Sequence, residues 1–170
     1  KEFVDKWNGF VFEMPSKQVT VKAESDYEGF ITSRCLETSA VDRILYNFIN
    51  NASRFAKSEE VKFTVLPIGD ELTRWVVENR VTDDQKKWLK ENVGAELKPI
   101  FLGGITRGGN GQGLLNCTNF VATSFGIDAE DAVNDGYIGA TVKRNTYYAW
   151  FHWPIYEEKD GDEVCDCGDH

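Results

Sequence analysis

The segment that decides the fold is Asp42–Phe55, with the sequence DRILYNFINNASRF. Ser39 can act as an N-cap just before it, and apolar residues recur at helical spacing from Ile44 to Ala52. We therefore predict a buried helix over about Ala40–Phe55.

This predicted helix carries its polar groups on one face. Asn47, Asn51 and Arg54 are spaced i, i+4 and i+7, so they share a side. The opposite, apolar side is formed by Leu45, Phe48, Ile49 and Ala52. An Asn oxygen suits Mg²⁺, and an Arg one turn later could meet phosphate oxygens. The same pattern is also that of an amphipathic helix whose polar face is merely solvated.

A second informative stretch is Gly108–Leu114, GGNGQGL, which leads into a predicted helix that Gly126 ends. Glycines let backbone N–H groups at a helix N-terminus approach phosphate closely, although a flexible surface loop has the same composition. A Walker A loop would need Gly-Lys-Ser/Thr, and a Rossmann loop a hydrophobic strand directly before it; neither is present.

The order of the remaining elements predicts the fold class. Two short strands lie within Asn8–Val21, and Glu60–Pro67 with Glu71–Glu78 forms a hairpin. Thr82 and Gln85 make a capping box for a short helix over Asp83–Glu91. The chain ends in two strands, Tyr137–Lys143 and Tyr147–Pro154. We expect an α+β fold, a two-layer α/β sandwich with helices on one face of a mainly antiparallel sheet.

Composition sets limits on function. The 170 residues are 41% hydrophobic and carry a net charge of −9, which suits one globular domain and argues against nucleic-acid binding. We expect residues 1–156 to form this domain and residues 157–170 to form an acidic, flexible tail. A metal site at Cys165, Cys167 and His170 lacks a second ligand pair, and Cys117 is expected to fill the core.

Taken together, the two stretches resemble the histidine-kinase ATPase family. Asn47–Phe55 is similar to its N box, usually Asn-Leu-x-x-Asn-Ala-x-Lys-Tyr/Phe, and Gly108–Leu114 resembles its second glycine box. The closing strand, ending at Pro154, also resembles the last strand of that family. The likeness runs over roughly Val19–Ile155 and implies the Bergerat fold shared with gyrase, the Hsp90 chaperones and MutL.

The resemblance also implies roles for individual residues. Asn51 would bind Mg²⁺, while Asn47 and Arg54 would lie at the phosphates of ATP. The triphosphate path would be lined by residues of the second glycine box, namely Gly108, Gly109, Gly111, Gly113 and Leu114. Hydrolysing relatives have a general-base Glu where this chain has Asn47, whose amide cannot accept a proton. Phosphoryl transfer to a partner therefore fits better than ATP hydrolysis.

At the adenine end, the family's first glycine box, Asp-x-Gly-x-Gly, corresponds to Glu78-Asn79-Arg80-Val81-Thr82. Glu78 or Asn79 would reach adenine, with Arg80 where a glycine usually stands. Arg107 and Lys98 lie in what would be the ATP lid, where a cation could neutralise charge on the γ-phosphate; Arg107 is the first candidate because it adjoins the glycines. For either residue, an exposed loop cation that binds no ligand is an equally good interpretation.

The expected partners follow from the same family. His152 is expected to be a strand residue rather than a phosphate acceptor, so the acceptor histidine lies on a separate dimerisation module, and a response regulator follows. The cytoplasm is the expected location, including the case of a cytoplasmic part of a larger membrane-bound sensor. The alternative is a degenerate relative that binds no ATP and acts as an interaction or phosphotransfer scaffold.

Overall fold

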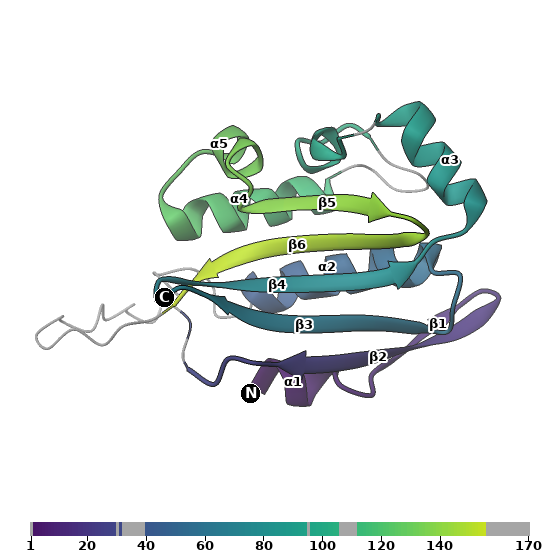
Figure 1. The fold of residues 1–170 in the computed structure, drawn as a ribbon, viewed down its shortest axis with the longest axis horizontal. Coiled ribbons are helices and arrows are strands. Elements are labelled where there is room, and N and C mark those ends of the chain that lie inside the picture. Colours follow the sequence, from purple (N-terminus) through teal and green to yellow (C-terminus); the bar gives the residue numbers. More distant parts are fainter. Residues whose placement is uncertain (1, 30, 32–39, 95, 106–111, 156–170) are drawn as a thin grey trace, which may run out of the picture.

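A six-stranded sheet forms one layer of the molecule (Figure 1). This computed structural model describes residues 2–29, 31, 40–94, 96–105 and 112–155. The strands are β1 (Val11–Met14), β2 (Lys17–Ser25), β3 (Glu60–Ile68), β4 (Leu72–Arg80), β5 (Ile138–Lys143) and β6 (Thr146–Pro154). Their order is β1-β2-β3-β4-β6-β5, and only the β2–β3 pairing is parallel.

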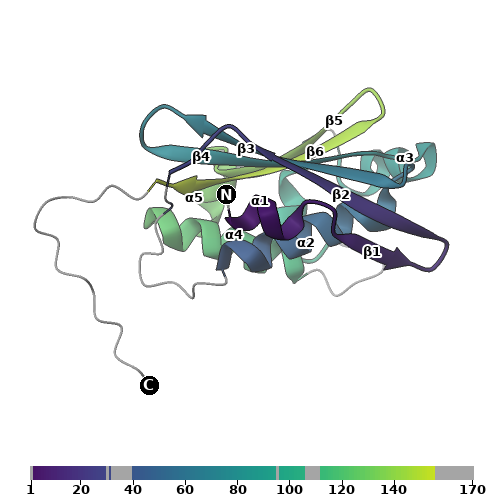
Figure 2. The same ribbon diagram turned by 90° about the horizontal axis from the view of Figure 1, so that it is seen from below.

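Helices make the second layer, and Figure 2 shows α2 and α4 on the same side of the sheet. The helical elements are α1 (Glu2–Trp7), α2 (Ala40–Phe55), α3 (Asp83–Asn92), the 3₁₀ turn η1 (Lys98–Phe101), α4 (Gly113–Phe125) and α5 (Ala129–Asn134). The predicted α+β sandwich, with a mainly antiparallel sheet and helices on one face, is confirmed. The sequence prediction missed α1, η1 and α5.

The core lies between the two layers and is rich in aromatic rings. Trp75 stacks on Phe63 and on Phe151, with ring centroids 5.9 and 5.6 Å apart. Phe48 of α2 meets Phe151 edge-on, at 5.6 Å. This packing stabilises α2 across the centre of the sheet, with its apolar face buried as predicted.

Local signals place the helix ends where the sequence predicts them. The Thr82 side chain accepts a hydrogen bond from the Gln85 backbone N–H (3.1 Å), which begins α3. Gly126 ends α4 in the left-handed conformation, with φ of 69°. Cys117 is buried in α4, as expected of a core residue, and burial raises the pKa of its thiol to about 12.

Candidate nucleotide pocket

A pocket opens where β4 ends and β6 begins, between α2, α3 and the start of α4. It holds about 590 Å³ of empty space, including its open mouth. Its lining comes from six elements and their connections: Asn51, Arg54, Phe55, Asn79, Val81, Gln85, Trp88, Leu89, Ile100, Ile105, Leu114 and Tyr147. Segments far apart in the sequence therefore build one concave site, as ligand pockets require.

One end of the pocket is formed by the polar face of α2. Asn51 and Arg54 both line it, as the helical spacing predicts. Asn47 lies one turn earlier and does not line the pocket, but it lies against the first turn of α4. A Cβ atom added at Gly113 would stand 2.9 Å from Asn47 Oδ1, closer than side chains tolerate. Glycine at position 113 thus allows α4 to approach α2 at this point.

The start of α4 adds positive character to the same end. Gln112, the N-cap residue of this 13-residue helix, makes no side-chain capping hydrogen bond. The backbone N–H groups of a first helical turn carry partial positive charge and are suited to an anion. Leu114, in that turn, lines the pocket.

Charge in the pocket is confined to one side chain. Arg54 is the only charged residue among the described lining residues, and its guanidinium lies 5.2 Å from the centre of the Phe55 ring. This local cation contrasts with the net charge of −9 over the whole chain. An anionic group would therefore be favoured at the Arg54 end.

The other end of the pocket is mostly apolar and contains a buried amide. Asn79 is 4% exposed. Its Nδ2 donates to the backbone oxygen of Arg80 (3.2 Å), and its Oδ1 has no hydrogen-bond partner among the described residues. Burial raises the pKa of the neighbouring Tyr147 phenol, which keeps it neutral. Flat apolar walls around a polar atom are typical of a site for a heterocyclic base.

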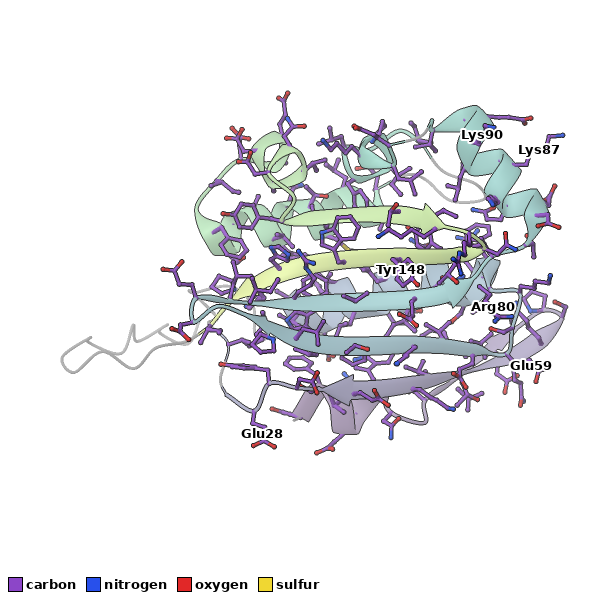
Figure 3. The ribbon with its side chains drawn as sticks, viewed as in Figure 1. Glu28, Glu59, Arg80, Lys87, Lys90 and Tyr148 are labelled. Carbon is purple, nitrogen blue, oxygen red and sulfur yellow. The ribbon has the colours of Figure 1, made fainter. Side chains whose placement is uncertain are left out.

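The structure does not bring Glu78 into this pocket. Residues alternate between the faces of β4, so Asn79 shares the helix side of the sheet with Val77, while Glu78 and Arg80 lie on the other side. Glu78 is paired with Tyr148 of β6, which Figure 3 marks together with Arg80. The Arg80 side chain likewise lies on the outer face of the sheet and does not line the pocket.

Several pocket residues were not predicted as site residues, among them Trp88 and Tyr147. Lys87 and Lys90 are exposed on the outer side of α3 (Figure 3), which leaves Gln85, Trp88 and Leu89 for the pocket. The i, i+3, i+4 spacing of these three residues is a signal that the sequence contains. Tyr147 is the cross-strand partner of Asn79, a pairing that only the sheet reveals.

Other predicted residues lie elsewhere. Arg107, Gly108, Gly109 and Gly111 fall outside the described residues, as does the tail. Lys98, in η1, is paired with Glu96 (3.7 Å) and does not line the pocket. Among the described residues, no group of three or more His, Cys, Asp or Glu could hold a metal ion.

Comparisons with known proteins give distant structural matches. No family model matches the sequence, and no curated protein matches it. The solved structures that the chain resembles include histidine kinases. Full-length ShkA in complex with AMPPNP is 20% identical with a TM-score of 0.49, and the match covers 79% of this chain but 26% of ShkA.

Two further histidine kinases match in the same way. The mycobacterial sensor histidine kinase MprB is 11% identical with a TM-score of 0.49, and 79% of this chain and 82% of that chain are covered. AdeS of Acinetobacter baumannii is 9% identical with a TM-score of 0.44, covering 93% of this chain and 59% of AdeS. Because matches this distant support no conclusion about function, we base the function on the pocket. Within the described part of the chain, each helix is too short or too polar to cross a membrane.

Proposed function

We propose that this chain is the ATP-binding catalytic domain of a sensor histidine kinase, which donates the γ-phosphoryl group of ATP to a histidine on a separate dimerisation module. The observation that supports this function is the convergence of three kinds of group in one pocket. The polar face of α2, the first turn of α4 and the amide of Asn79 are suited to metal, phosphate and base respectively.

The described residues fit ATP and Mg²⁺ by their chemistry. Asn51 would offer a hard side-chain oxygen to Mg²⁺. Arg54 can bind phosphate oxygens, and the first turn of α4, where Leu114 lines the pocket, offers them backbone N–H groups. When bound, Mg²⁺ neutralises charge on the phosphates. Gly108, Gly109, Gly111 and Arg107 remain predictions for the triphosphate path.

Phosphoryl transfer is favoured over hydrolysis by what lines the pocket. The described lining residues include no Asp, Glu or His that could activate a water molecule. Asn47, the position of the general base in hydrolysing relatives, is an amide that donates to the backbone oxygen of Arg43 (2.9 Å). The nucleophile would therefore come from the partner module, with a response regulator as the next acceptor, and the cytoplasm supplies the ATP.

Titration calorimetry of the full chain with ATP tests this proposal, with and without Mg²⁺. We expect Asn51→Ala to weaken binding about tenfold or more in Mg²⁺, because a metal ligand is lost. Removing Mg²⁺ with EDTA should weaken ATP binding by the wild-type chain by a similar factor, and should change ATP binding by the Asn51→Ala variant little. Asn50, the adjacent asparagine of α2, does not line the pocket, so the control variant Asn50→Ala should bind ATP like the wild-type chain.

Two results would contradict the proposal. If the wild-type chain binds no ATP even at millimolar concentration, the proposed kinase function is wrong and the scaffold alternative is favoured. Equal binding by Asn51→Ala and wild type in Mg²⁺ would show that the metal lies elsewhere.

A further inference from the structure

The outer face of the sheet carries an apolar strip that no described helix covers. The helices α2, α4 and α5 lie on the other side of the sheet (Figure 2), and the strands are open toward the viewer in Figure 1. Alternate residues of β6 point to this outer face, among them Tyr148 (Figure 3) and Trp150, both partly exposed. Val76 of β4, the cross-strand partner of Trp150, is also partly exposed. These three side chains form the apolar strip.

Within the strip, Trp150 is held against the sheet. Its Nε1 donates to the backbone oxygen of Gly136 (3.2 Å). A Cβ atom at Gly139, its cross-strand partner on β5, would stand 2.5 Å from Trp150 Cζ2, so glycine leaves the room that the ring occupies. Because the indole is already fixed, a partner that packs on it pays little side-chain entropy. Rigid aromatic side chains of this kind are typical anchors at protein interfaces.

Cations lie at both ends of the apolar strip. At one end, Arg80 of β4 (Figure 3) and Lys143 of β5 are both cross-strand partners of Thr146, so their side chains share the outer face. Both are exposed, and neither forms an ion pair with a described residue. At the other end, Arg74 Nε donates to His152 Nε2 (3.0 Å), which holds the guanidinium on the same face. A histidine nitrogen that accepts this bond carries no proton, so it adds no charge of its own.

Carboxylates on the neighbouring strands add little negative charge to this face. Glu60 lies 3.0 Å from Lys22, and Glu24 lies 3.9 Å from Lys62. Glu78, near the middle of the face, is the cross-strand partner of Lys62. The cations at the ends of the strip thus form a local positive surface in a chain whose net charge is −9. Such a surface attracts an acidic partner segment and orients it.

We propose that the outer face of the sheet binds an extended acidic segment of a partner protein, in which two apolar side chains lie between two carboxylates. Arg74 and Arg80 are six residues apart on β4, which corresponds to about 20 Å in a strand. Side chains on one side of an extended segment recur at every second residue. Carboxylates at its first and seventh positions would meet the cations, while apolar groups at the third and fifth would pack on Tyr148 and Trp150.

The position of Glu78 favours a peptide over a nucleic acid. A phosphate backbone would carry negative charge along the whole strip and past this carboxylate, whereas the proposed peptide is charged only at its ends. The surface lies on the opposite side of the sheet from the nucleotide pocket, which is lined by Asn79 and the α2 face. The proposal is therefore independent of nucleotide binding.

Fluorescence anisotropy of a labelled synthetic peptide tests the proposal on the full chain. The probe is Glu-Ser-Phe-Ser-Phe-Ser-Glu with blocked ends, so that only its carboxylates are charged. The comparison peptide, Glu-Phe-Ser-Phe-Ser-Ser-Glu, has the same composition but places its aromatic rings on the other side of the extended segment. We expect the comparison peptide to bind about tenfold more weakly. Raising the salt from about 0.05 M to about 0.5 M should also weaken binding of the probe, because exposed charges are screened.

Variants of the chain identify the surface. Tyr148→Ser should weaken the probe about tenfold, whereas Tyr46→Ser, a change of an exposed tyrosine of α2, should not. Arg80→Gln should weaken it about threefold, whereas Lys90→Gln, a change of an exposed lysine of α3, should not. Thermal denaturation verifies that each variant is folded. Because Arg80 is exposed, its variant keeps the test decisive even if Tyr148→Ser does not fold.

Several results would overturn the proposal. They are absence of probe binding at millimolar concentration, equal binding of the two peptides, and wild-type affinity in folded Arg80→Gln and Tyr148→Ser. Tighter binding of a single-stranded oligonucleotide than of the probe would assign the face to nucleic acid instead. Self-association of the wild-type chain in sedimentation velocity, abolished by Arg80→Gln, would assign it to a second copy of the chain.

Discussion

Substituting Gly113 by Ala tests the contact that joins α2 to the start of α4. The new Cβ would stand 2.9 Å from Asn47 Oδ1 and 3.8 Å from Asn47 Cγ, so the Asn47 amide must move. Moving it weakens its hydrogen bond to the Arg43 oxygen, a loss of about 1 kcal/mol. Alanine is a better helix former than glycine by at most about 1 kcal/mol. We therefore expect the free energy of unfolding to change little.

Nucleotide binding should respond much more strongly than stability. A methyl group at Gly113 displaces the Asn47 amide, which we propose lies beside the phosphates, and so would disturb phosphate binding at the first turn of α4. Gly113→Ala should weaken Mg-ATP binding by about tenfold, or about 1.4 kcal/mol, measured by titration calorimetry. Urea denaturation of the same samples separates this loss from unfolding.

A double-mutant cycle with Asn47→Ala identifies the cause. With the amide gone, the Gly113 methyl has room, and we expect a coupling free energy of about 1 kcal/mol between the two substitutions. If Gly113→Ala weakens binding equally in both backgrounds, the contact with Asn47 is not responsible and our account of Gly113 is wrong.

Two further predictions concern stability. Burial, and to a smaller extent the positive charge of Arg74, lowers the pKa of His152 from 6.5 to about 4 in the folded chain. The unfolded chain therefore binds a proton at this residue between pH 6.5 and 4, and the folded chain does not. The contribution of His152 to the free energy of unfolding should be complete above pH 6.5 and fall by at most about 3 kcal/mol as the pH drops to about 4. Urea denaturation across this range should show a shallower dependence for His152→Gln; an unchanged slope would contradict this assignment. Gly126 has a φ of 69°, a left-handed conformation that alanine tolerates poorly and asparagine better. In thermal denaturation, Gly126→Ala should lower the free energy of unfolding by about 1–2 kcal/mol and Gly126→Asn by less. Equal losses for the two variants would show that the left-handed conformation is not the cause.

Much of the fold could be predicted because its signals are local. Ser, Thr and Gly at helix ends and a helical apolar period located α2, α3 and α4. The missed elements are short: α1 and α5 have 6 residues each and η1 has 4. Such segments contain too few turns for a period to be recognised, and packing on the rest of the fold stabilises them.

The sequence could not decide whether Glu78 or Asn79 faces the pocket. Trp75, Val76 and Val77 are three successive large apolar residues, so the alternation along β4 fits either face of the sheet. A shift of one residue in this alternation would place Glu78, instead of Asn79, on the helix side of the sheet. The structure decides between them, because Asn79 is buried on the side of α2 and Glu78 is not.

The sequence by itself determined the strands, the longer helices α2, α3 and α4, and the polar face that Asn47, Asn51 and Arg54 share. Each of these follows from neighbours within one or two turns of the chain. Only the tertiary structure decided that β2 and β3 pair in parallel and that Asn47 meets Gly113. It also placed Asn79 opposite the α2 face in one pocket. These contacts join distant segments, so they depend on how whole layers pack and not on any local pattern.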